Sequence, residues 1–162
     1  QALCKPLIER IPISPTNKAP NVQQPQVLLL GYNRVGEIFV TSFKLAELKF
    51  LVIDYDPEQI ELLKKKRLPH LYGDIADVEL LDTVNLDSLK LVISNLKDLS
   101  VNLTAIKHLI GRKAGLNIIS FAQTKEESAS LTQAGATKVI LPYQQSAKKL
   151  ASLIEKHGLD LR

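Results

Sequence analysis

From Gln26 onward, short runs of leucine and β-branched residues alternate with longer segments whose apolar residues recur every three to four positions. This alternation predicts parallel strands joined by crossover helices. The expected strands are residues 26–31, 50–54, 70–72, 89–94, 117–121 and 138–141. Because such crossovers are right-handed, the elements should form a doubly wound α/β sheet of six parallel strands, in the order 3-2-1-4-5-6, with helices on both faces.

The segments between these strands carry helix signals. Helices are expected over residues 35–46, 57–66, 99–110, 125–134 and 143–157, with a short one from residue 78. Asp56 and Asp77 are expected N-caps, and Gly111 and Gly135 are expected left-handed stops. In the first helix, the stripe expected to face the sheet comprises Val35, Ile38, Phe39, Ser42, Phe43 and Ala46.

The chain divides into three parts. Residues 1–25 carry a short apolar repeat and then four prolines, which predicts a helical turn followed by a linker. Residues 26–142 are the expected α/β domain, and residues 143–162 the expected C-terminal crossover helix. In that helix a narrow apolar seam either meets a partner subunit or packs on the chain's own sheet. The seam comprises Ala147, Leu150, Ala151 and Ile154.

Composition excludes several classes of protein. The single cysteine, Cys4, cannot form an internal disulfide, and no histidine and cysteine cluster has metal-ligand spacing, so no metal is expected. No apolar run approaches the roughly 20 residues that span a bilayer. The net charge is +4, but the densest basic run, residues 64–67, ends a predicted helix and lacks interleaved aromatic residues. We therefore expect no nucleic-acid partner.

Residues 27–36 combine a buried strand, a tight turn and a helix start. In a Rossmann-like fold, this arrangement points backbone N–H groups at a phosphate. Gly31 permits the turn and Gly36 lets helix and strand pack closely, but Asn33 stands at the middle glycine of G-x-G-x-x-G. Its side chain occupies space that a pyrophosphate uses. The turn therefore predicts a nucleotide site and leaves open whether a dinucleotide fits.

Polar residues follow the next strands at the same edge of the expected sheet. Asp54 ends the second strand, where an acid accepts hydrogen bonds from ribose hydroxyls and repels a 2′-phosphate, favouring NAD, NADH or an adenine mononucleotide over NADP. Asp74 is positioned to accept from an adenine amine. Ser94 and Asn95 face the same crevice. Both aspartates have an alternative role as helix caps or solvated loop acids.

Several runs together resemble the RCK domain, the regulator of potassium conductance, which is also the Trk-type N-terminal nucleotide-binding domain. The runs are VLLLGYNRVG, VIDYDPEQIELL, YGDIADVELL, KLVISNLKD, AIKHL and AGATKVILP, and the resemblance covers about residues 26–158. The N-terminal LCKPLIER is similar to the stretch that follows the last transmembrane helix in Kef-type cation:proton antiporters. The resemblance therefore indicates an excised carboxyl-terminal domain of such an antiporter.

The resemblance implies a regulatory domain, and not an enzyme, that gates transport of potassium or another monovalent cation. It implies NAD or NADH as ligand, or alternatively AMP, ADP or ATP. The expected partners are a transmembrane transporter or channel domain in the same polypeptide and a second copy of the chain. The expected location is the cytoplasmic face of the plasma (inner) membrane.

By position, the resemblance assigns the phosphates to the turn around Asn33, the ribose to Asp54 and the adenine to Asp74. No catalytic residue is expected. The full expected cofactor-binding set is Gly31, Tyr32, Asn33, Arg34, Val35, Gly36, Asp54, Tyr55, Asp74, Ile75, Ser94 and Asn95.

Two other functions stay open. If Asn33 closes the site, the chain is a nucleotide-free assembly scaffold of a transporter. A small NAD-dependent oxidoreductase is less favoured, because that reaction needs a proton donor near the nicotinamide. The sequence has no Y-x-x-x-K pair, and one helix alone is expected after the last strand.

Overall fold

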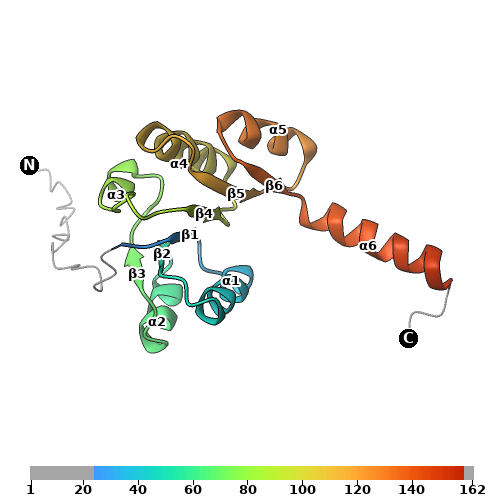
Figure 1. The fold of residues 1–162 in the computed structure, drawn as a ribbon, viewed down its shortest axis with the longest axis horizontal. Coiled ribbons are helices and arrows are strands. Elements are labelled where there is room, and N and C mark those ends of the chain that lie inside the picture. Colours follow the sequence, from blue (N-terminus) through green and yellow to red (C-terminus); the bar gives the residue numbers. More distant parts are fainter. Residues whose placement is uncertain (1–23, 159–162) are drawn as a thin grey trace, which may run out of the picture.

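Within residues 24–158, which the computed structural model describes, six parallel strands form one sheet (Figure 1). The order β3-β2-β1-β4-β5-β6 confirms the predicted doubly wound topology. The predicted turn and linker lie outside the described residues, except for Gln24 and Pro25. The strands are β1 (Val27–Leu30), β2 (Phe50–Asp54), β3 (His70–Tyr72), β4 (Leu91–Ser94), β5 (Asn117–Phe121) and β6 (Lys138–Ile140).

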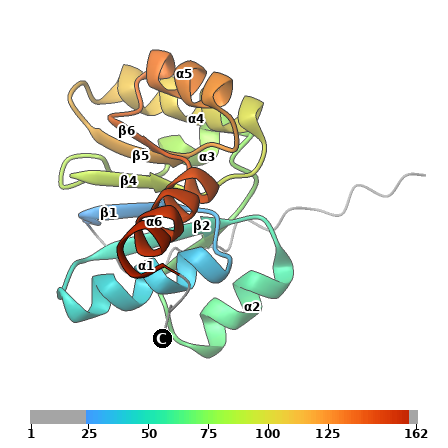
Figure 2. The same ribbon diagram turned by 90° about the vertical axis from the view of Figure 1, so that its right-hand side faces the viewer.

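Six helices follow the strands within the same residues. Figure 2 shows α1 and α2 on one face of the sheet and α3, α4 and α5 on the other. This arrangement confirms the expected helices on both faces. The bounds are α1 (Arg34–Leu45), α2 (Pro57–Lys65), α3 (Val78–Asp82), α4 (Leu99–Arg112), α5 (Lys125–Ala134) and α6 (Pro142–His157).

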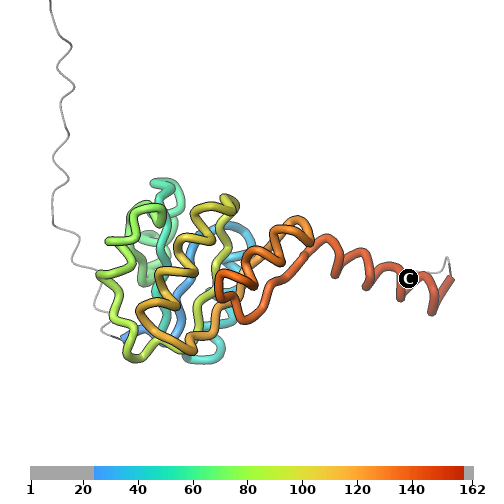
Figure 3. Tube along the Cα trace, turned by 90° about the horizontal axis from the view of Figure 1, so that it is seen from above, coloured from blue at the N-terminus to red at the C-terminus, as the bar shows by residue number. Residues whose placement is uncertain are grey.

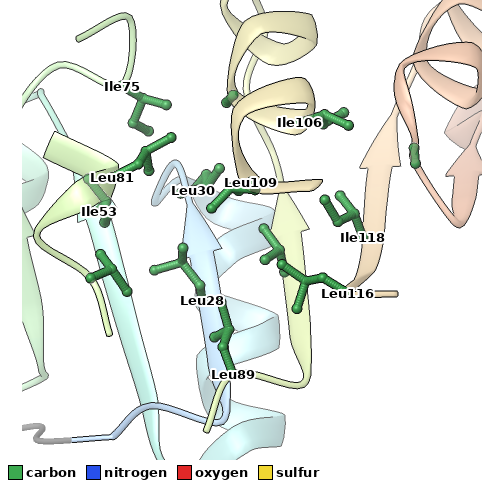
Figure 4. Packing of buried hydrophobic residues seen from close by; sticks show 14 of the residues in the cluster. Leu28, Leu30, Ile53, Ile75, Leu81, Leu89, Ile106, Leu109, Leu116 and Ile118 are labelled. Carbon is green, nitrogen blue, oxygen red and sulfur yellow. The ribbon is translucent and has the colours of Figure 1, made fainter. Parts of the chain in front are cut away.

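The core has two parts because β1 is covered on both faces. Side chains alternate along the strand, so Leu28 and Leu30 pack toward α4 while Leu29 packs toward α1. Figure 4 shows Leu28 and Leu30 among Ile106, Leu109 and other residues of the first cluster. Full burial of each such leucine contributes about 1.5–3 kcal/mol. This buried central strand holds the start of the turn that follows it.

Helix α1 is rotated relative to the expected stripe. Val35 and Ile38 are 41% and 66% exposed, and the buried residues are Gly36, Val40 and Phe43. The expectation that Val35, Ile38, Ser42 and Ala46 face the sheet is therefore wrong. A Cβ at Gly36 would lie 3.1 Å from the carbonyl oxygen of Gly31, so the close approach of helix to strand at this glycine sets the rotation.

The expected left-handed stop at Gly111 is also wrong, because α4 continues through it to Arg112. Tertiary contacts hold this helix end. Arg112 Nη1 donates to the carbonyl of Leu81 at 2.6 Å. The ammonium of Lys113 donates at 2.7, 3.1 and 2.8 Å to three carbonyl oxygens before β4, those of Leu86, Asp87 and Leu89. At the end of α5, Gly135 does adopt the left-handed conformation, with φ of 116°.

Helix α6 stands apart from the sheet, as Figures 1 and 3 show. None of its residues is buried, and four of its large apolar side chains are 41–81% exposed. The alternative in which the seam packs on the chain's own sheet is therefore wrong. Across residues 24–158, no helix is both long and apolar enough to cross a bilayer. The four exposed side chains are Tyr143, Leu150, Leu153 and Ile154.

Candidate functional site

A cavity of about 510 Å³ is lined by the loops that follow β1, β2, β3 and β4. We call it the switch-point cavity, because β1 pairs with β2 on one side and β4 on the other, where the winding of the sheet reverses. Ligands of open α/β sheets bind at this position. The volume lies within the range of about 300–1,000 Å³ that small-molecule sites have.

The turn after β1 depends on Gly31. Its φ is +87°, a left-handed conformation that glycine adopts without strain. A Cβ there would lie 3.1 Å from the carbonyl oxygen of Asn95. Glycine at this position therefore allows the β1 and β4 loops to approach each other at the cavity floor.

The carboxylate of Asp54 joins the ends of β1 and β2. It is 6% exposed. Its Oδ2 accepts from the backbone N–H of Tyr32 at 2.5 Å, and its Oδ1 accepts from that of Asp56 at 2.8 Å. A carboxylate offers about four acceptor positions. Asp54 thus holds two loops and keeps capacity to accept from a ligand.

The side chain of Asn33 caps α1. Its Oδ1 accepts from the backbone N–H groups of Val35 at 2.9 Å and Gly36 at 3.2 Å. It also accepts from Nδ2 of Asn95 at 2.5 Å. Asn33 itself has extended backbone, with φ of −131°, as N-cap residues do. Two of the four amides that open at a helix start are therefore bound by this side chain.

Further aspartates line the switch-point cavity and stabilise its rim. Asp74 accepts from the N–H of Ala76 at 2.9 Å, and Asp56 caps α2 as expected. Asp98 caps α4. The hydrogen bonds that Asp98 accepts, first from the N–H of Val101 and then from Ser100, hold the pKa of its carboxyl below the ordinary value.

Eight of the twelve expected site residues line the switch-point cavity. They are Gly31, Tyr32, Asn33, Asp54, Tyr55, Asp74, Ile75 and Asn95. Arg34, Val35 and Gly36 lie in the first turn of α1 and outside the lining. Ser94 is fully buried, and its hydroxyl donates to Asn102 Oδ1 at 2.8 Å. The structure therefore directs Ser94 into the core beneath α4.

Other lining residues were missed by the sequence reasoning. Most lie three or more positions beyond the end of a strand. They are found when each expected loop is extended to include the first turn of the helix that follows it. They are Asp56, Gln59, Ala76, Leu96, Lys97, Asp98 and Val101. In the described part of the chain, no three histidine, cysteine or acidic side chains gather closely enough to hold a metal ion.

The model of one family, the TrkA-N domain, matches residues 27–142, well over half of the chain. The chain belongs to the TrkA-N domain family. This membership confirms the resemblance to the Trk-type nucleotide-binding domain.

One similar protein is the glutathione-regulated potassium-efflux system protein KefC of Escherichia coli O139:H28. It is 29% identical to this TrkA-N domain over 138 residues, which are 85% of the chain and 22% of that protein. The chain therefore spans less than a quarter of the length of KefC.

Two solved structures share the fold. The TrkA-N domain of inner membrane protein ybaL from Escherichia coli has a TM-score of 0.75 and 21% identity, over 81% of this chain and 97% of that one. The Kef CTD of Shewanella denitrificans, in its AMP-bound form, has a TM-score of 0.66 and 19% identity, over 82% of each chain.

Proposed function

We propose that this TrkA-N domain gates the transport of potassium or another monovalent cation when it binds NAD(H) or an adenine nucleotide such as AMP, ADP or ATP. The observation that carries the proposal is the switch-point cavity. Asp54 and Asp74 line it as acceptors, and an adenosine presents ribose hydroxyls and an adenine amine as donors. Two relatives support the proposal, since one is named a potassium-efflux system and the other holds AMP.

A regulator of this kind acts by binding its ligand with different affinity in two conformations of the attached transporter. The switch-point cavity suits this role because its walls come from separate loops. The Tyr32–Asp54 and Asn33–Asn95 hydrogen bonds join the β1 loop to its two neighbours. A ligand between the loops changes their spacing. The role needs a transmembrane transporter or channel domain in the same polypeptide, with this domain at the cytoplasmic face, and it needs no catalytic group.

The exposed face of α6 supports a homodimer. Tyr143, Ala147, Leu150 and Ile154 recur at helical spacing along one side of the helix, and all are exposed. In the proposed dimer this face meets a second copy. Light scattering should give twice the chain mass for the wild type and for Ser152→Asp, on the opposite side of α6. Leu150→Asp with Ile154→Asp should give the monomer mass. A monomeric wild type would remove the dimer from the proposal.

The capped amides at Val35 and Gly36 favour a second candidate, the nucleotide-free scaffold. Titration calorimetry with NADH, NAD, AMP and ATP separates the two candidates. At least one ligand should bind the wild type with one site per chain. Asp74→Ser should weaken that binding at least tenfold, while Asp77→Ser, outside the cavity lining, should leave it unchanged. Serine retains the capping ability of both positions. Four null titrations would favour the scaffold.

A separate assay tests the oxidoreductase alternative. The regulatory role predicts that NADH absorbance stays constant when the chain is incubated with a panel of aldehydes, ketones and quinones. Steady turnover of any of them, abolished by Asp54→Ala, would replace the regulatory role with an enzymatic one.

A further inference from the structure

Asn33 occupies the position that a ligand phosphate needs. In nucleotide-binding sheets, a phosphate oxygen accepts hydrogen bonds from the amides at the start of the first helix. Here the amides of Val35 and Gly36 already donate to Asn33 Oδ1. A phosphate that binds both amides must first displace this side-chain oxygen.

The cap is itself held in place. Asn95, on the loop after β4, donates its side-chain amide to the same oxygen of Asn33 at 2.5 Å. Three donors therefore converge on one oxygen atom. Displacing the Asn33 oxygen breaks the hydrogen bond between the β1 and β4 loops as well as the helix cap. Loss of an N-cap alone carries a free-energy cost that would weaken phosphate binding about tenfold.

The remaining charge of the switch-point cavity also disfavours phosphate. Four aspartates and one lysine, Lys97, line it. The aspartates are Asp54, Asp56, Asp74 and Asp98. Each carboxylate repels a phosphate, and each accepts hydrogen bonds from hydroxyl and amine groups. The lining thus matches the nucleoside part of a ligand better than its phosphates.

We propose that Asn33 is a specificity-determining residue. Its side chain caps the backbone amides of Val35 and Gly36, which would otherwise bind a phosphate, so the cavity recognises its ligand through the adenine nucleoside. This inference rests on the proposed function and narrows its ligand to an adenine nucleoside or nucleoside monophosphate. Each additional phosphate is repelled by the cavity's carboxylates and finds the amides of Val35 and Gly36 already capped, so ADP, ATP and NAD(H) bind more weakly than AMP. The backbone amides of Val35 and Gly36 become available to a phosphate when the Asn33 side chain is removed.

The test is calorimetry with adenosine, AMP and NAD on the 162-residue chain and two variants. The wild type should bind adenosine and AMP with affinities within about threefold of each other. Asn33→Gly should bind AMP and NAD about tenfold more tightly and adenosine unchanged, because glycine frees the amides and costs little stability at an N-cap. Asn33→Asp keeps the cap and adds a charge, so AMP should bind more weakly and adenosine equally well. Thermal melting establishes that each variant is folded.

The outcomes separate this inference from the proposed function. If the wild type binds AMP or NAD more than a hundredfold more tightly than adenosine, and Asn33→Gly changes no affinity, the inference is overturned while nucleotide regulation stands. If none of the three ligands binds the wild type or either variant, the proposed function fails and the inference fails with it.

Discussion

The backbone N–H of Tyr32 donates to the carboxylate of Asp54 at 2.5 Å, across the ends of two neighbouring strands. The two residues are nearly inaccessible, at 2% and 6% exposure. A single acid thus fixes the geometry of the glycine turn and provides an acceptor to the switch-point cavity. Stability and ligand binding should therefore change together when it is replaced.

We expect Asp54→Ala to lower the free energy of unfolding by about 1–3 kcal/mol, because the buried N–H of Tyr32 loses its acceptor. The same variant should weaken adenosine binding at least tenfold. Asp54→Asn retains one acceptor oxygen, so its stability and its adenosine affinity should lie between those of the wild type and those of Asp54→Ala. Urea unfolding and calorimetry measure both effects. An Asp54→Ala protein with wild-type stability and affinity would contradict this reading of the carboxylate.

Gly36→Ala tests the close approach of α1 to the turn. Alanine is favoured over glycine in helices by about 1 kcal/mol. At Gly36, however, a Cβ would meet the carbonyl oxygen of Gly31 at 3.1 Å, and that backbone belongs to a tight turn. We expect overpacking to outweigh the helical preference and give a net loss of about 1 kcal/mol.

Gly111→Ala is the matched control. Gly111 lies inside α4, and a Cβ there would meet no atom within 4 Å. This variant should gain about 0.5–1 kcal/mol. Urea unfolding of the two variants measures the difference. The two substitutions should change the free energy of unfolding in opposite directions. A stabilised Gly36→Ala would show that the turn shifts to accommodate the added methyl group.

Asn102 links α4 to two strands through a buried polar network. It accepts from Ser94 Oγ at 2.8 Å and donates to Ser120 Oγ at 2.9 Å, and all three side chains are at most 1% exposed. Asn102→Ala leaves both hydroxyls without this partner and opens a void, so the free energy of unfolding should fall by about 2–4 kcal/mol.

Replacing all three polar side chains by apolar ones separates two contributions to stability, the hydrogen bonds of the network and the packing of its side chains. The combination of Ser94→Ala, Asn102→Leu and Ser120→Ala removes the polar atoms together, which is often nearly neutral. Chemical denaturation should show that the triple variant recovers at least half of the loss. A triple variant less stable than Asn102→Ala would show that the network contributes net stability.

The carboxyl of Asp98 should make stability depend on pH. Its pKa is lowered in the folded chain by the hydrogen bonds from Val101 and Ser100. Its contribution is therefore fully present above the unfolded pKa of about 3.9 and is lost as pH falls through the lower folded pKa. Asp98→Asn keeps an acceptor for the cap and does not titrate. Between about pH 5 and 2.5, urea midpoints should fall more steeply for the wild type than for this variant. Parallel profiles would contradict the assignment.

The sheet was predictable because each strand is short, apolar and separated by a helical segment. The rotation of α1 was not. Counting apolar residues favours Val35 and Ile38 as the buried face, whereas the contact between Gly36 and the Gly31 carbonyl decides the orientation. That contact joins two backbones, and the hydrophobic pattern carries no information about it.

The lining of the switch-point cavity was predictable where a residue ends a strand or follows it within two positions, as with Asp54, Asp74 and Asn95. Ser94 shows the limit of this rule. Its register opposite Leu30 and Ser120 puts it inside the sheet, and its partner Asn102 comes from α4. The partner is set by helix packing, which the local sequence does not specify.

Helix α6 projects from the sheet, so a change in its direction at the base moves its far end by a larger distance. Its 16 residues begin at Pro142, and Leu141 joins them to Ile140, the last residue of β6. At a rise of 1.5 Å per residue the helix extends about 24 Å, so a tilt of about 10° at its base displaces its tip by about 4 Å. Any change in the direction of α6 at its junction with β6 therefore produces a larger displacement at the carboxyl end of the helix than at its start.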